Sequence, residues 1–130
     1  MPNLYWYLGP KADREFLKEL GDENILFDSK TIWVNFEARD VSGDGLIINS
    51  EKRLSRGRIL ITSKRFSCIV GGRKIINLPR TGNLIKKLKI DKADSERFSI
   101  SCGLGDFSSD LKGTIKLSFH IDPNQVESYL

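Results

Sequence analysis

The chain has little of the residue types on which metal centres, disulfide frameworks and membrane spans depend. It has two cysteines and one histidine in 130 residues. Cys68 and Cys102 are too few for a disulfide framework, and even with His120 they do not make a four-ligand zinc site. No apolar run approaches the ~18 residues that a transmembrane helix requires. These shortages argue against a disulfide-rich fold, a zinc domain and a helical membrane protein.

The single histidine and the lack of a phosphate-binding glycine motif argue against an enzyme. His120 falls on the polar side of an alternating strand pattern, and no serine or cysteine is placed beside it by the sequence. The segment GLGDFSSD at 103–110 lacks the Lys-Ser/Thr pair of a P-loop and the third glycine of a dinucleotide fingerprint. We therefore expect a non-catalytic protein with no metal and no cofactor.

The cysteine positions and the start of the chain also bear on where the protein works. Cys68 and Cys102 each lie in an apolar or alternating run, which favours small buried thiols in a reducing compartment over a disulfide. The start, MPNLYWYLG, lacks the charged and long apolar regions of a signal peptide. We expect a cytoplasmic protein, at most peripheral on a membrane, that forms one domain over residues 1–130.

Apolar periodicity predicts two helices around a series of short strands. Pro10 precedes a helix predicted over 11–20, with Gly21 as its C-cap. Strands are predicted at 25–38, 46–48, 57–62, 66–70, 73–78, 84–90, 97–102 and 114–121, with a turn-rich break at 40–45, a polar connector at 51–56 and a hairpin turn at Gly71-Gly72. Asp122 and Pro123 begin a short C-terminal helix. The fold class is therefore mostly β with flanking helices, as an antiparallel sandwich or small barrel.

The positive charge of the chain is concentrated in one stretch. Residues 51–92 hold thirteen Lys or Arg and two acids, a net charge of +11, whereas the rest holds eight Lys or Arg and fifteen acids, a net charge of −7. Solvated surface charges that keep β-edges from pairing are the alternative interpretation, which accounts well for isolated lysines and poorly for this segregation. A segregated positive field indicates a surface that binds an anionic partner.

The centre of that stretch resembles a known family. The segment GRILITSKRF at 57–66 resembles the glycine, alternating-hydrophobic, Thr-Ser-x-Arg pattern of GRAM and bacterial PH-like domains. The following strands match such a domain in order, and IKLSFHIDPNQVESYL at 115–130 is similar to the last strand and closing helix of GLUE domains. The resemblance covers about 23–130. It implies an antiparallel β-barrel or orthogonal sandwich closed by a C-terminal helix, with the aromatic arm and helix of 1–21 outside the pattern.

The resemblance also implies a binding function. PH-like modules bind phosphoinositides, other anionic lipids or protein segments, so the leading expectation is peripheral recognition of anionic lipid head groups at a membrane surface. Basic residues near the hairpin turns are the most available ones, with arginine as a planar fork for phosphate and lysine as a point charge. The predicted anion-binding residues are Lys52, Arg53, Arg56, Arg58, Lys64, Arg65, Arg73 and Lys74.

Two other partners are considered. A protein-interaction or self-association module would use the aromatic arm at 4–8 or an open strand edge. Nucleic acid is the weaker partner, because 51–92 contains one aromatic residue, Phe66, which the family pattern places in the core, and stacking on bases requires exposed aromatics.

Calcium is the lowest alternative. DVSGDGLIINSE at 40–51 matches an EF-hand loop at Asp40, Ser42, Asp44, Gly45 and Glu51. The segment before it reads as a strand, and the segment after it is basic and interrupted by a glycine. An acidic, glycine-rich turn is the favoured interpretation.

Overall fold

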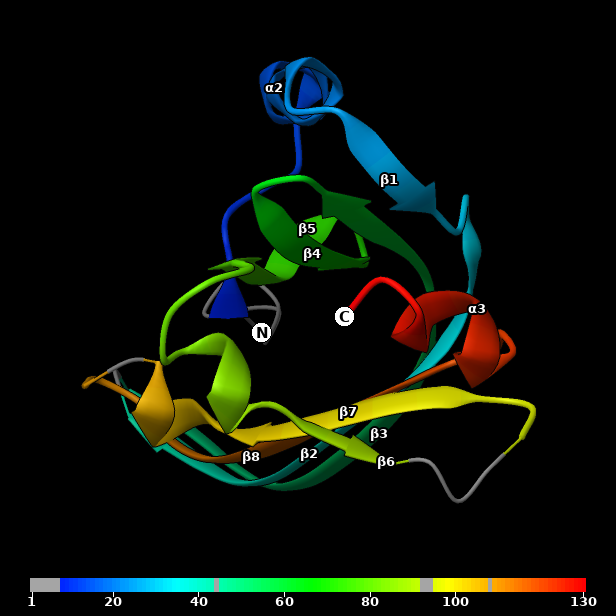
Figure 1. Cartoon of the computed structure of the whole chain (residues 1–130). Helices are drawn as coiled ribbons and strands as arrows, with labels where there is room; N and C mark the ends of the chain where they lie inside the picture. Colours follow the sequence, from blue (N-terminus) through cyan, green and yellow to red (C-terminus); the bar gives the residue numbers. More distant parts are fainter. Residues whose placement is uncertain (1–7, 44, 92–94, 108) are drawn as a thin grey trace.

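The computed structural model describes residues 8–43, 45–91, 95–107 and 109–130, which form a curled antiparallel sheet with short helices (Figure 1). The elements in order are α2 Arg14–Asp22, β1 Ile25–Asp28, β2 Ile32–Gly43, β3 Leu46–Thr62, β4 Arg65–Val70, β5 Arg73–Pro79, η1 Ile85–Lys87, β6 Lys89–Asp91, β7 Phe98–Gly103, η2 Leu104–Asp106, β8 Lys112–Phe119 and α3 Pro123–Glu127. The strand order is β5-β4-β3-β2-β8-β7-β6, and β1 pairs with β3. The sheet is a half-barrel with edges at β5 and β6, and the mostly-β prediction is confirmed.

The long strand β3 joins the two halves of the sheet. Its first part pairs with β2 up to Gly57, and its second part pairs with β4 and β1 from Gly57 onward. A Cβ at Gly57 would lie 2.8 Å from Val34 Cγ1, 2.9 Å from the Ile69 carbonyl oxygen and 3.1 Å from Phe119 Cε1. The strand therefore changes sheet half at the one residue type that leaves room for this close approach.

The core fills the concave side of the half-barrel. The alternation predicted for the last strand is confirmed, because Ile115, Leu117 and Phe119 are buried against the core while the residues between them are not. Cys68 and Cys102 are free and buried in the same core. Burial raises the pKa of Cys68 well above its usual range and raises that of Cys102 to about 11.

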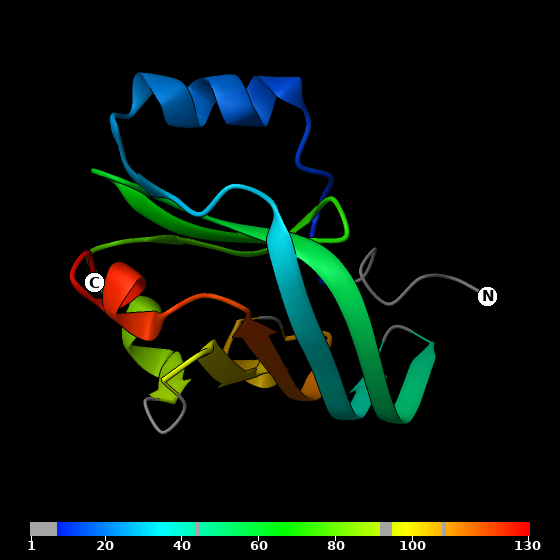
Figure 2. The ribbon, with the colours of Figure 1, turned by 90° about the vertical axis from the view of Figure 1, so that its right-hand side faces the viewer.

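The helix α2 covers one convex side of the sheet. Its Phe16 and Leu20 are buried against Leu60 of β3 and Ile69 of β4, and Figure 2 shows the helix lying along this half of the sheet. The helix begins later than predicted, because the Asp13 carboxylate caps it by accepting from Phe16 N at 2.9 Å. Gly21 lies inside the helix, not at its C-cap as predicted. Within the described ranges, no helix is long and apolar enough to cross a membrane.

Two turn predictions are confirmed. Gly71 and Gly72 have φ angles of 58° and 78° and join β4 to β5. Asp122 caps α3 by accepting from Asn124 N at 2.9 Å, with Pro123 at the start of the helix.

Several element predictions are wrong in their extent. The strand predicted at 25–38 is two strands, β1 and β2, and the strands predicted at 46–48 and 57–62 belong to the single strand β3. The polar segment 51–56 is the middle of β3 and not a connector, because β2 supplies a hydrogen-bonding partner along its whole length. The predicted break at 40–45 is narrower, since β2 continues to Gly43. The strand predicted at 84–90 is a 3-10 turn followed by the short β6. Of the aromatic arm at 4–8, only Leu8 lies within the described residues, and it packs against the core.

Candidate functional site

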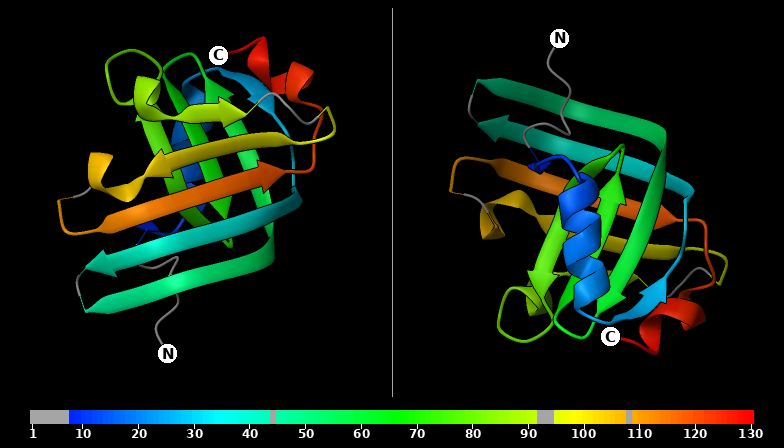
Figure 3. Two further views of the ribbon diagram at one scale, coloured as in Figure 1. Left: turned by 90° about the horizontal axis from the view of Figure 1, so that it is seen from below. Right: turned by 90° about the horizontal axis from the view of Figure 1, so that it is seen from above.

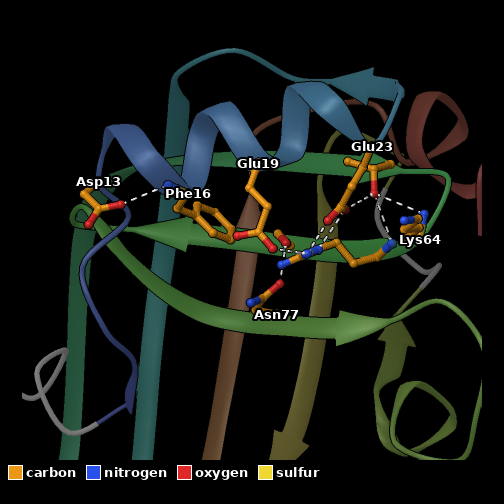
Figure 4. A network of polar contacts seen from close by, with 9 residues as sticks. Asp13, Phe16, Glu19, Glu23, Lys64 and Asn77 are labelled. Carbon is orange, nitrogen blue, oxygen red and sulfur yellow. Dashed lines mark hydrogen bonds and ion pairs between the residues drawn. The ribbon is translucent and has the colours of Figure 1, made fainter.

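The predicted ligand-binding residue Arg65 is already held by carboxylates of this chain. Its Nε donates to Glu23 Oε1 at 2.8 Å, and its Nη2 donates to Glu19 Oε1 at 2.8 Å and to Glu23 Oε2. Thr62 Oγ1 donates to the same Glu23 oxygen as Nε, at 2.9 Å. Figure 4 shows Glu19 and Glu23 directed from the end of α2 toward the strand beneath them. This network attaches α2 to the sheet, and it engages Nε and Nη2 of Arg65 with two carboxylates of the same chain.

The Thr-Ser-x-Arg part of the family-like pattern therefore has a structural role here. Thr62 Oγ1 accepts from Lys64 N at 3.2 Å and from Arg65 N at 3.1 Å, which forms the turn between β3 and β4. The Ser63 hydroxyl donates to the Glu23 carbonyl. Burial opposes ionisation of Glu23, but the hydrogen bonds from Arg65 and Thr62 outweigh it and lower the pKa of this carboxyl.

Two more of the predicted basic residues have carboxylate partners. Arg58 donates to Asp28 from Nε at 2.9 Å and from Nη2 at 2.6 Å, which attaches β1 to β3. The hydrogen bonds from Arg58 hold the pKa of Asp28 well below its usual range, against the opposing effect of burial. Arg53 pairs with Glu51 on the same strand. Of these two arginines, only Arg58 makes its contact with a different strand.

The basic residues at the hairpin turns do not converge. Lys64 precedes β4 and Arg73 follows the turn after it, so the length of this six-residue strand separates them by roughly 17 Å. The Lys74 ammonium lies 4.3 Å from the centre of the Phe16 ring, under α2. The eight predicted residues therefore surround the sheet rather than share one pocket.

The two arginine–carboxylate pairs predict a pH-dependent stability. Glu23 and Asp28 have lower pKa values in the folded chain than in the unfolded chain, so their stabilisation is complete above a carboxyl's unfolded value of about 4 and is lost as the pH falls through the folded values. The double variant Glu23→Gln, Asp28→Asn is expected to lose roughly 2 kcal/mol per site at pH 7, and its deficit relative to the unmodified protein is expected to shrink only as the pH falls below about 4 toward the folded pKa values. Urea denaturation from pH 7 down to about pH 2 measures both curves.

A control for this effect is Glu15→Gln, which neutralises an exposed glutamate of α2. Its pH profile is expected to follow that of the unmodified protein. Parallel profiles for the double variant and the unmodified protein would contradict the assignment of the stabilisation to these two carboxylates.

Among the described residues, no helix or strand covers the outer face of the other half of the sheet, opposite α2. Figure 3 (left) shows β3, β2, β8, β7 and β6 side by side on this side, with α2 behind them. Strand alternation and register give the outward positions, which we call the open face: Trp33, Asn35, Glu37 and Arg39 of β2; Ser50, Lys52, Leu54 and Arg56 of β3; Lys112, Thr114, Lys116 and Ser118 of β8; Ser99 and Ser101 of β7; and Lys89 and Asp91 of β6. Only Lys52 and Arg56 of the predicted set are among them.

The open face is positively charged. It carries six Lys or Arg and two acids. Both acids form ion pairs with cations of the same face: Glu37 Oε1 lies 2.7 Å from Arg39 Nη2, and Asp91 Oδ2 lies 4.0 Å from Lys116 Nζ. Within the described part of the chain, Lys52 and Lys89 form no ion pair. An excess of cations therefore faces solvent on one side of the molecule.

Apolar side chains also reach solvent on the open face. Trp33 is 48% exposed and Leu54 is 57% exposed. The Arg56 guanidinium lies 5.4 Å from the centre of the Trp33 ring. The aromatic content of residues 51–92 did not indicate Trp33, because this residue lies on the neighbouring strand β2. The alternating patterns of β2 and β8 were the signal, since they place Arg39, Lys116 and Trp33 on the outward side.

A groove lies within the open face. It has a volume of about 370 Å³ and is lined by Glu37, Arg39, Lys89, Ser101, Cys102, Gly103, Thr114, Ile115 and Lys116. Three of these residues are cationic and one is a carboxylate. The lining of the groove therefore has a net charge of +2, and the hydroxyl groups of Ser101 and Thr114 can donate hydrogen bonds there.

The calcium alternative gains no support from the geometry. Residues 40–43 and 46–51 lie on the paired arms of the β2–β3 hairpin, and Glu51 accepts from Arg53. An EF-hand loop lies between two helices and gathers its ligands around one point. Among the described residues, no three His, Cys, Asp or Glu side chains gather in a group that would hold a metal ion.

No protein-family model, curated protein or solved structure matches this chain. A convex, cationic sheet face with a tryptophan and a leucine at its surface is suited to binding an extended anionic partner.

Proposed function

We propose that the protein is a non-catalytic module that binds anionic membrane surfaces through the open face. The observation that carries this proposal is the asymmetry between the two convex sides of the sheet. One side is covered by α2, which buries Phe16 and Leu20 on it. The other side, which no element of the described residues covers, carries six cations, two acids and the exposed Trp33 and Leu54.

The two kinds of side chain on the open face suit a membrane surface together. Each Lys or Arg near an anionic leaflet contributes about 1 kcal/mol of attraction. A tryptophan at the surface favours the head-group region, where its ring is in an apolar layer and its N–H remains hydrated. Trp33 lies beside Arg56, and Leu54 lies between Lys52 and Arg56 on β3. Electrostatic attraction and shallow apolar contact would thus act at the same place.

The order of elements supports a PH-like assignment of the fold. Strands β2 to β5 form one meander and β6 to β8 form a second, and the two join where β2 pairs with β8. The helix α3 follows β8 directly and buries Val126 in the core. A barrel-like sheet followed by a C-terminal helix is what the resemblance implies, and membrane or protein recognition is the function that such domains have.

Nucleic acid is the weaker partner for the same face. Base stacking requires aromatic rings with a free surface. Among the described residues of the open face the only aromatic is Trp33, and the Arg56 guanidinium lies over its ring. Without base stacking, only salt-dependent electrostatic attraction would remain, and this attraction does not distinguish nucleic acid from other polyanions.

The proposal predicts retention on vesicles that depends on lipid charge and on salt. The full chain is expected to co-sediment with phosphatidylcholine vesicles that contain 30% phosphatidylserine and to stay in solution with pure phosphatidylcholine, since about six cations face the membrane. Raising the salt from about 0.1 M to about 0.5 M shortens the Debye length and is expected to release most of the protein. Equal recovery with acidic and neutral vesicles would contradict the proposal.

Protein interaction is the second candidate, and one feature favours it. An apolar groove of about 340 Å³ lies beside the edge strand β5, and its lining includes Leu8, Ile76, Leu78, Leu104 and Phe107. An extended peptide that adds to a sheet edge buries alternate side chains in such a groove. If recovery is the same with acidic and neutral vesicles, protein interaction becomes the leading candidate function.

A further inference from the structure

The first half of β3 is an open edge of the sheet. β2 pairs with β3 from Leu46 to Gly57, whereas β4 pairs with it only from Gly57 onward and β1 only from Leu60 onward. Residues 46–56 therefore have one neighbouring strand among the described residues, and Figure 3 (left) shows this half of β3 as the outermost strand beside β2. An edge strand of this length can accept a further strand.

The peptide groups at this edge lack hydrogen-bond partners. Successive residues of a strand direct their N–H and C=O groups to opposite sides. The Arg56 carbonyl accepts from Gly71 N at 3.0 Å, on the side of β3 that faces away from β2. In steps of two, Leu54, Lys52 and Ser50 direct their peptide groups to that same side. Within the described ranges, no hydrogen bond reaches these three residues there, so the edge presents a row of unpaired donors and acceptors.

The edge is not protected by the usual interruptions of an edge strand. Residues 46–56 contain no proline, and no bulge breaks their pairing with β2. The charged residues lie in the second part of this segment, whereas the first part is apolar. Ile47 is 81% exposed and is flanked by Leu46 and Ile48. The edge therefore has an apolar end and a charged end.

This polarity makes the segment complementary to itself in the antiparallel direction. With a twofold axis at Ser50, Lys52 lies opposite Ile48 of a second copy, and Leu54 lies opposite Leu46 of that copy. Leu54 is 57% exposed, so the pairing covers an apolar side chain of each copy. The residues whose peptide groups point to the edge also face each other in this register, as an antiparallel ladder requires.

Charge favours the same register over its neighbours. An axis at Glu51 would place two glutamates directly opposite each other, and an axis at Lys52 would do the same with two lysines, both of which are destabilising. With the axis at Ser50, no charged residue of 46–54 lies opposite another. Ile47 then lies opposite Arg53, whose long stem covers apolar surface.

We propose that two copies of this chain pair through residues 46–54 of β3 in the antiparallel direction, with a twofold axis at Ser50. A twofold interface of this kind is closed, so association stops at the dimer. Because the axis is perpendicular to the sheet, both open faces lie on the same side of the dimer. The dimer goes beyond the proposed function, and only its consequence, attraction of one membrane by two linked open faces, rests on that function.

The mass of the full chain in solution tests the dimer without lipid. Light scattering at about 100 μM is expected to give twice the 14.8 kDa of one chain, and dilution to about 1 μM is expected to lower this mass, because an interface made by one strand is at the small end for specific complexes. The mass of one chain at the higher concentration would overturn the proposal.

A proline at the axis tests the edge itself. Ser50→Pro removes an N–H group that points away from β2, so it costs no bond within the chain, and it is expected to give a monomer. Ser50→Ala keeps the N–H group and is expected to remain a dimer. Circular dichroism confirms that each variant is folded. A folded Ser50→Pro variant that is still a dimer would overturn the β3 edge as the interface.

Cysteine cross-linking tests the register and does not depend on the proline variant. Opposite Cα atoms of antiparallel strands lie about 5.5 Å apart, which suits a disulfide. Ser50→Cys is expected to form a linked dimer under mild oxidation at least about tenfold faster than Leu54→Cys, whose two copies are roughly 27 Å apart along the strands. The native Cys68 and Cys102 are buried and do not compete. Equal rates for the two variants would overturn the pairing.

Vesicle co-sedimentation separates the failure of this proposal from the failure of the proposed function. A dimer that is not retained on acidic vesicles would refute the proposed function and leave the β3 interface supported. A monomer that is retained would refute the dimer and leave the proposed function supported.

Discussion

Reversing three charges of the open face, with Lys52→Glu, Arg56→Glu and Lys116→Glu in one chain, is expected to abolish retention on acidic vesicles at physiological salt. Each cation contributes about 1 kcal/mol of attraction to an anionic leaflet, and each glutamate adds repulsion. A loss of at least 3 kcal/mol corresponds to a binding constant about a hundredfold smaller. Vesicle co-sedimentation over a range of lipid concentrations measures the change.

The matched control places the same charge change on the opposite side of the molecule. Lys11, Arg14 and Lys18 are exposed residues in and before α2, which covers the other convex side of the sheet. The triple variant Lys11→Glu, Arg14→Glu, Lys18→Glu has the same net charge as the open-face variant, so a surface-specific effect is expected to leave most of its retention in place. Equal losses in the two variants would show that net charge, and not the open face, determines binding.

Replacing Gly57 by alanine is expected to destabilise the chain by about 2 to 3 kcal/mol, the range for overpacking a filled core. The new methyl would lie 2.8 Å from Val34 Cγ1 and 2.9 Å from the Ile69 carbonyl oxygen. The side chain of Val34 has little room to move, and the carbonyl belongs to the strand pair that β3 forms with β4. Thermal unfolding is expected to shift downward by roughly 6 to 15 °C.

Gly21→Ala is the control for this substitution. Gly21 lies inside α2, and a Cβ at this position would meet no atom within 4 Å. Alanine is expected to stabilise the helix by about 0.5 to 1 kcal/mol, because it loses less conformational freedom than glycine. A melting temperature for Gly57→Ala equal to that of the unmodified protein would contradict the role of Gly57 as the corner between the two halves of the sheet.

Much of the fold was accessible from local patterns. The alternation of Ile115, Leu117 and Phe119, the Gly71-Gly72 turn and the Asp122 cap were all predicted and are confirmed, because each depends on residues that are close in sequence. Segment 51–56 was misassigned for the opposite reason. Its polar residues have no strand signal of their own, and the hydrogen-bonding partner that makes them a strand is β2.

The difference between local patterns and partners that are distant in the sequence also explains which parts of the candidate site were predicted. The basic block at 51–92 was correctly identified as a charge feature, but its members have different roles. Arg65 and Arg58 are held by Glu23 and Asp28, which lie 42 and 30 residues away in the chain. No local pattern reveals a carboxylate at that separation.

The sequence alone determined that the chain is mostly β, that its charge is segregated and which residues alternate on each strand, since these follow from residue type and spacing. The tertiary structure decided which cations are neutralised, which remain exposed and which convex side is covered. The reason is physical: the attraction between charges depends on distance and solvent exposure, and only the pairing of β2, β8, β7 and β6 places Arg39, Lys116 and Lys89 on one face with Lys52 and Arg56.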